Sequence, residues 1–203
     1  MTSHPVDTEE KIKEAAQRIF LEKGFDGTTI RDIAEAAQIN TALTNYYFRS
    51  KEKLFWLVYE SLLKEALKSV QAILDKPIGV KEKLVELLDH MFEVHGQNPN
   101  QAIFLMNECR RNPQGFADKI GINCGAMEQG FILQFEEEVK KGLIIDISPD
   151  TIFPLIFGLI QQIFAGRELT MHLFQMNEAE FNKHALEQKK IIKEMLLKYL
   201  FIE

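Results

Sequence analysis

Residues 25–55 read FDGTTIRDIAEAAQINTALTNYYFRSKEKLF, and this stretch decides the fold. It predicts two short helices joined by a tight turn at 38–40 and followed by a third, longer helix. Thr29 with Asp32 fits a capping box for the first short helix, and Asn40 is a favoured N-cap for the second. Helices this short are stable only when their neighbours hold them, so the outer face of the second helix is available for another contact.

The rest of the chain is also predicted to be helical, with almost no alternating pattern typical of strands. Ser50 caps a long helix that ends near Leu74. A nearly apolar helix is expected over 149–173, and Asn177 with Glu180 caps the last helix. We therefore expect an all-α fold of about nine helices. A three-helix head with a helix-turn-helix shape would occupy residues 1–52, and a larger helical body would occupy residues 53–203.

The composition excludes several classes of protein. The chain has 203 residues, 46% of them hydrophobic and 27% charged, a normal balance for a soluble domain. No nucleophile–base set, phosphate loop or Cys/His cluster appears, so we predict neither an enzyme nor a metal or cofactor site. Cys109 and Cys124 are expected to be reduced, partly buried thiols. Single histidines such as His95 are read as surface or hydrogen-bonded side chains.

Membrane and export signals are also missing from the sequence pattern. The N-terminal residues contain no apolar stretch typical of a secretion signal. The longest apolar run, over 152–165, is interrupted by Pro154, Gly158 and two glutamines, and it is too short and polar to span a bilayer. We therefore expect a cytoplasmic protein without a membrane partner.

The head carries side chains suited to double-stranded DNA. A groove-reading helix needs side chains that meet base edges and flanking donors that grip phosphates. Thr41 and Asn45 share one face of the second short helix; an Asn can bond adenine through two hydrogen bonds, and the Thr41 and Ala42 methyls can meet a thymine methyl. The full set of predicted DNA contacts is Thr28, Thr29, Arg31, Asn40, Thr41, Ala42, Asn45, Tyr46, Tyr47 and Lys51.

Charge and spacing leave an alternative open, namely a three-helix bundle with an ordinary solvated surface. The net charge is -6, and the first 55 residues hold eight Lys or Arg against nine Asp or Glu. A single copy should therefore bind DNA weakly, and useful affinity requires two copies.

Taken together, the head resembles the N-terminal domain of the tetracycline-repressor (TetR) family of bacterial transcriptional regulators. The resemblance covers about the first quarter of the chain, and it rests on Ala15-Ala16, Phe20, Gly24-Phe25, Thr28-Thr29-Ile30-Arg31-Asp32-Ile33-Ala34, Asn40-Thr41-Ala42-Leu43-Thr44-Asn45-Tyr46-Tyr47-Phe48 and Ser50-Lys51-Glu52-Lys53-Leu54.

The resemblance implies a ligand-responsive homodimer that binds a pseudo-palindromic operator, usually as a repressor. By position, Thr29 and Arg31 would flank the DNA backbone, and Tyr46, Tyr47 and Lys51 would hold phosphates. The family often has Thr where this chain has Leu43, a buried aliphatic residue at position 44 and Tyr at position 45. Thr44 would pack its methyl and bond its hydroxyl back to Asn40, and Asn45 implies a different operator.

For the body, the resemblance implies a homodimer through the last two helices and a site for a small apolar or amphipathic effector. The apolar helix over 149–173 would use one face for its own core and another for its partner, although a fully buried central helix of a monomer fits the pattern too. The candidate pocket residues are Phe104, Met106, Cys109, Met127, Phe131, Phe135, Phe157, Gln161 and Phe164.

Aromatic and Met stripes are also typical of ordinary core, whereas Gln161 inside an apolar helix needs a buried partner that a ligand would supply. Two rival functions remain at this point: an all-α carrier of apolar ligands, and a protein-interaction dimer whose head binds no DNA.

Overall fold

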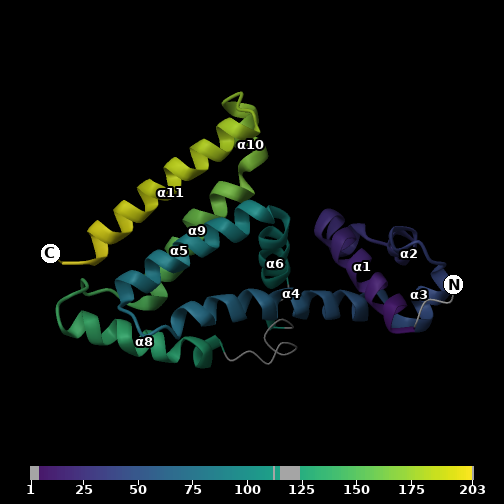
Figure 1. The fold of residues 1–203 in the computed structure, drawn as a ribbon, viewed down its shortest axis with the longest axis horizontal. Helices are drawn as coiled ribbons and strands as arrows, with labels where there is room; N and C mark the ends of the chain where they lie inside the picture. Colours follow the sequence, from purple (N-terminus) through teal and green to yellow (C-terminus); the bar gives the residue numbers. More distant parts are fainter. Residues whose placement is uncertain (1–4, 112, 115–123, 203) are drawn as a thin grey trace. The chain divides into compact units, whose positions relative to one another are not determined.

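The computed structural model describes residues 5–111, 113–114 and 124–202, except for the side chains of residues 5–7 and 124–128 (Figure 1). The Cys124 thiol and the Met127 side chain lie outside these described residues. The helices are α1 (Pro5–Gly27), α2 (Ile30–Ala37), α3 (Thr41–Phe48), α4 (Lys51–Leu74), α5 (Val80–Gln97), α6 (Pro99–Arg111), α8 (Cys124–Lys140), α9 (Pro149–Ala165), α10 (Arg167–Leu173) and α11 (Glu178–Leu200). Within the described part of the chain there are ten helices, and β pairing is limited to an isolated bridge between Ile144 and Phe201. The all-α prediction is confirmed.

The chain forms two compact units. Unit 1 contains the residues up to Ala66 and a segment that begins at Phe104; unit 2 contains Leu67–Ile103 and the chain from α8 onward. The sequence predicts a boundary at residues 52 and 53 instead, at the start of α4. The difference arises because α4 as far as Ala66 and α6 from Phe104 onward pack with the head.

Unit 1 has an aromatic core around Phe55. The rings of Phe20 and Phe25 lie 5.1 and 4.8 Å from the Phe55 ring, and Phe104 from α6 lies 5.7 Å from it. Gly24 makes this packing possible, because its φ of 69° reverses the chain at the end of the regular part of α1. The Tyr59 hydroxyl donates to the Leu105 carbonyl (3.0 Å). The end of α6 is thereby fixed to α4 inside this unit.

Unit 2 is built from α5, α9 and α11, which pack against one another, with α8 against α5 and α9 (Figure 1). Leu88, Phe135, Ile160, Phe181 and Leu200 are almost completely buried in its core. α10 contacts both α9 and α11. The α5–α9–α11 layer therefore supplies most of the apolar contacts that stabilise this unit.

One predicted helix is broken. The sequence pattern indicates a single helix over 149–173, but α9 ends at Ala165 and α10 begins at Arg167 with a bend of 58°. At the break, a Cβ on Gly166 would lie 2.9 Å from the carbonyl oxygen of Gln162. Only glycine fits this close backbone approach without a shift, so the bend is encoded by Gly166.

Candidate nucleic-acid interface

The starts of α2 and α3 are held by hydrogen bonds that involve the residues predicted to cap these helices. The Asp32 amide donates to Thr29 Oγ1 (3.1 Å), and the Thr29 amide donates to Asp32 Oδ2 (2.8 Å), so the capping box is confirmed. Gln38 adopts the left-handed conformation at the end of α2. The Leu43 amide donates to Asn40 Oδ1 (2.7 Å), which confirms Asn40 as the N-cap of α3.

α3 is anchored through its inner face. Thr44 and Phe48 are buried there, and the Thr44 hydroxyl donates to the Asn40 carbonyl (3.4 Å). Thr44 therefore occupies a core position as predicted, with its methyl packed and its hydroxyl satisfied. An eight-residue helix held in this way presents its opposite face in a fixed orientation.

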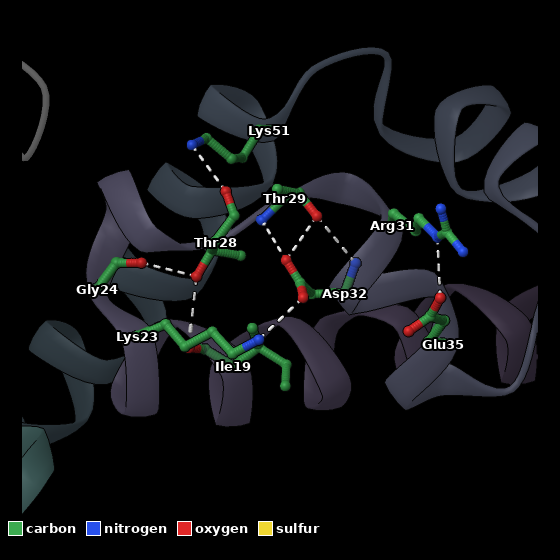
Figure 2. Close-up of polar contacts among 9 residues, drawn as sticks. All are labelled: Ile19, Lys23, Gly24, Thr28, Thr29, Arg31, Asp32, Glu35 and Lys51. Carbon is green, nitrogen blue, oxygen red and sulfur yellow. Dashed lines mark hydrogen bonds and ion pairs between the residues drawn. The ribbon is translucent and has the colours of Figure 1, made fainter.

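An ion pair fixes α2 to α1, as Figure 2 shows. Lys23 Nζ lies 2.9 Å from Asp32 Oδ1, while the other carboxylate oxygen accepts hydrogen bonds from the Thr29 amide and hydroxyl. The Lys23 ammonium and these hydrogen bonds hold the pKa of Asp32 well below its usual value. Asp32 therefore has two structural roles: it completes the N-terminal capping box of α2, and it forms the ion pair with α1.

Thr28 does not lie on the outer surface that the sequence predicts for it. Its side chain is buried, and its hydroxyl donates to the Gly24 carbonyl (2.7 Å) and approaches the Ile19 carbonyl (3.4 Å), as Figure 2 shows. The reversal at Gly24 brings these carbonyls to Thr28. As a correction to the prediction, the Thr28 side chain stabilises the α1–α2 junction and is not exposed to DNA.

Lys51 makes its described contacts with its own unit. Its ammonium donates to the carbonyls of Phe25 (2.8 Å) and Thr28 (2.9 Å) and lies 4.2 Å from the centre of the Phe25 ring. These carbonyls belong to the end of α1 and the following turn, where helical hydrogen bonding stops. Lys51 therefore joins the start of α4 to the α1–α2 junction (Figure 2); its contact with a phosphate stays a prediction.

The outer face of α3 is polar and aromatic. Thr41, Ala42, Asn45 and Tyr46 are exposed, and the exposed fraction of Tyr46 reaches 78%. The half-buried Tyr47 ring meets the Tyr46 ring edge to face, with 5.5 Å between their centres. These side chains offer hydroxyls, an amide and methyl groups at the surface, a chemistry that suits base edges and phosphate oxygens.

Basic side chains flank α3 on both sides in the sequence. Arg31, in the first turn of α2, has an 82% exposed side chain and pairs with Glu35 at 3.0 Å. Arg49, which the sequence reasoning missed, is exposed at the C-cap of α3 with a positive φ of 45°. A basic residue directly after a candidate groove-reading helix is the signal that would have identified it.

The candidate pocket residues are divided between the two units. Phe104, Met106 and Cys109 belong to unit 1, and Phe131, Phe135, Phe157, Gln161 and Phe164 belong to unit 2. Phe104 packs on Phe55, and Cys109 Sγ lies 3.1 Å from the Tyr59 hydroxyl oxygen. Phe131, Phe135 and Phe164 are buried in the core of unit 2, whereas Phe157 is 36% exposed. The pocket stays a prediction.

Unit 2 exposes an apolar surface along its last helices. Among the described residues, 11 of the 15 exposed large hydrophobic side chains lie between Leu155 and Ile202. They include Leu155 and Leu159 on α9 and Ile191, Met195 and Tyr199 on α11; the exposed fractions of these five range from 50% to 61%. We call these five residues the α9–α11 face. Its members recur at intervals of four residues, so each helix presents them on one side.

Within the described residues, no group of three or more His, Cys, Asp or Glu side chains is placed to hold a metal ion. In the same part of the chain, no single helix is long and apolar enough to cross a membrane; α9 and α10 meet that length and composition test only as a bent pair.

Comparison with known proteins identifies the head. Residues 12–56 match the family model described as bacterial regulatory proteins, tetR family. The chain is 29% identical over 109 residues to the HTH-type transcriptional repressor KstR2 of Mycolicibacterium smegmatis, covering 54% of this chain and 53% of that protein. It is 34% identical over 92 residues to the probable HTH-type transcriptional regulator YttP of Bacillus subtilis, covering 44% and 42%. The chain thus spans about half the length of these curated relatives.

Solved structures show the same fold over nearly the whole chain. A putative fatty acid metabolism regulator from Clostridium perfringens matches with a TM-score of 0.66 at 21% identity, covering 95% of this chain and all of that one. FadR from Bacillus subtilis in complex with stearoyl-CoA matches with a TM-score of 0.61 at 17% identity, covering 90% and 96%. The capped α2–turn–α3 geometry and the family match agree, and residues 12–56 belong to the family described as bacterial regulatory proteins, tetR family.

Proposed function

We propose that this protein is a transcriptional repressor that binds a pseudo-palindromic DNA operator as a homodimer and responds to a small ligand. The observation that carries the proposal is the outer face of α3, where Thr41, Ala42, Asn45 and Tyr46 are exposed while Thr44 and Phe48 anchor the helix. Asn45 and the two methyl-bearing residues would approach bases. The family match to residues 12–56 supports this reading over the carrier and protein-interaction alternatives.

The proposed DNA surface differs from the predicted set of contacts at two residues, Thr28 and Arg49. Thr29, Arg31, Asn40, Tyr47 and Lys51 remain as candidates for contacts beside the bases. Thr28 is removed because it is buried. Arg49 is added because it is exposed directly after α3, where its guanidinium can reach a phosphate.

The dimer is proposed to form through the α9–α11 face. Monomers rarely expose large apolar surfaces, and a twofold interface would bury the same residues of the α9–α11 face on both copies. A head with no basic excess also needs a second copy, since each copy adds its own base and phosphate contacts. Two α3 helices could then enter successive major grooves about 34 Å apart.

Ligand response is proposed for the body. A shift of a few ångströms between the heads would prevent both α3 helices from entering successive grooves, so a ligand that favours another arrangement would release DNA. The complex of the structurally similar FadR with stearoyl-CoA supports a ligand-binding body of this fold. The head (1–52) would then bind the operator, and the body (53–203) would bind the ligand.

The test is selection of bound sequences from a random duplex library by the full-length protein at two salt concentrations. The proposal expects enrichment of one inverted repeat, bound by two chains, with affinity that falls steeply as salt rises. Enrichment of no sequence at either salt concentration would favour the carrier or the protein-interaction alternative.

A further inference from the structure

His95 presents a buried nitrogen that no described protein group satisfies. The side chain lies near the end of α5 and is only 6% exposed. Its Nδ1 lies 2.8 Å from the Met91 carbonyl oxygen, which can only accept a hydrogen bond. Nδ1 therefore carries the proton of the neutral ring, and Nε2 holds a lone pair.

Among the described residues, Nε2 has no hydrogen-bond partner and is shielded from solvent. Leaving such an atom unpaired is unfavourable, and buried polar atoms of native proteins are nearly always paired with protein, water or ligand. Two apolar rings lie beside the imidazole: the centres of the Phe157 and Phe164 rings are 6.3 and 5.8 Å from its centre. The Phe92 ring lies 5.5 Å from the Phe164 ring. The atom is thus a single acceptor in an aromatic environment.

The charge state of the ring decides what can bind. Burial lowers the pKa of His95, and the neighbouring His90 acts in the same direction, while the Met91 hydrogen bond opposes them. The neutral ring at neutral pH can accept a hydrogen bond through Nε2 but cannot donate one there. A carboxylate or an ether oxygen would place lone pair against lone pair, whereas a hydroxyl would satisfy the nitrogen.

We propose that His95 Nε2 is the polar anchor of the effector site and that its ligand is a small apolar molecule carrying a hydroxyl group. Phe157 and Phe164 form the apolar walls, and the ligand enters beside Phe157, the wall that is 36% exposed. The inference rests on the proposed ligand response and specifies its ligand class.

The experiment compares two probes that differ in one group: p-cresol, which donates a hydrogen bond, and 4-methylanisole, which cannot. Both are titrated into the full-length protein labelled with ¹⁵N-histidine, and the His95 Nε2 resonance is followed. We expect p-cresol to shift this resonance and to bind about fivefold more tightly than 4-methylanisole. His95→Phe should abolish the preference, whereas His172→Gln, at an exposed histidine of α10, should retain it.

Three results would overturn the assignment: equal affinity of the two probes, a preference that persists in His95→Phe, or no shift with p-cresol up to about 10 mM. An Nε2 resonance that already reports a hydrogen bond in the free protein, and that p-cresol leaves unchanged, would assign the atom to a structural water and also overturn it. Operator selection is measured separately without probe. Loss of operator binding therefore refutes the proposed function, whereas failure of the probes refutes only the anchor.

Discussion

Replacing Lys51 by Met tests whether this lysine holds the head together or grips DNA. The change keeps a long apolar side chain but removes the ammonium that donates to the Phe25 and Thr28 carbonyls at 2.8 and 2.9 Å. A hydrogen bond from a charged donor contributes about 1.5 to 3 kcal/mol, and a cation over an exposed ring adds about 0.5 to 1 kcal/mol. Because the carbonyls are only partly buried and can regain water, we expect a net loss of about 2 to 3 kcal/mol.

The assay is urea unfolding followed by the fluorescence of Trp56, the single tryptophan of the chain, which packs on Phe55 and Tyr59 inside unit 1. The midpoint of the unfolding transition of Lys51→Met should move to a lower urea concentration, while the dependence of the free energy of unfolding on urea stays unchanged. Lys53→Met, two residues further along and exposed, is the matched control and should leave the transition in place. The reasoning fails if Lys51→Met unfolds like the parent protein while the slope of log affinity against log salt falls by about 0.9, the signature of one lost phosphate contact.

Three further changes have defined outcomes. Thr29→Ala removes the acceptor for the Asp32 amide and should lower the free energy of unfolding by about 1 kcal/mol in the same urea assay; an unchanged midpoint would argue against the capping box. Met195→Glu on the α9–α11 face should yield monomers in analytical ultracentrifugation and reduce operator affinity by about 100-fold, and a dimer of unchanged stability would exclude this face. Because burial lowers the pKa of His95, the unfolded chain takes up a proton below about pH 6.5 while the folded chain resists it, so stability falls as the pH drops through that range. Thermal unfolding of His95→Phe between about pH 7 and 5 should show a shallower decline, and an identical decline would contradict the buried assignment.

The sequence predicted the local elements of the head well. The caps at Thr29, Asn40 and Ser50 depend on side chains and amides within three residues of each other, and all three are present. The box of Asn177 and Glu180 at the start of α11 is confirmed for the same reason. Capping signals are short-range, so a single sequence contains what is needed to place them.

Contacts that depend on how the chain folds back on itself could not be predicted from the sequence. Thr28 and Lys51 have polar types suited to phosphates, but the reversal at Gly24 brings carbonyls to both of them. The bend at Gly166 was missed because an isolated glycine in an apolar run is compatible with a continuous helix. The part of α6 from Phe104 to Arg111 was assigned to the body, yet it belongs to unit 1, where the Tyr59 hydroxyl donates to the Leu105 carbonyl across 46 positions.

Base recognition by α3 through Asn45 is tested by repeating the random-duplex selection with Asn45→Ala. We expect the same inverted repeat to be enriched, with sequence preference reduced at one symmetry-related position in each half and intact elsewhere, because an amide that recognises one base contributes about 1 to 3 kcal/mol of discrimination. An enriched motif identical at every position to that of the parent protein would contradict it.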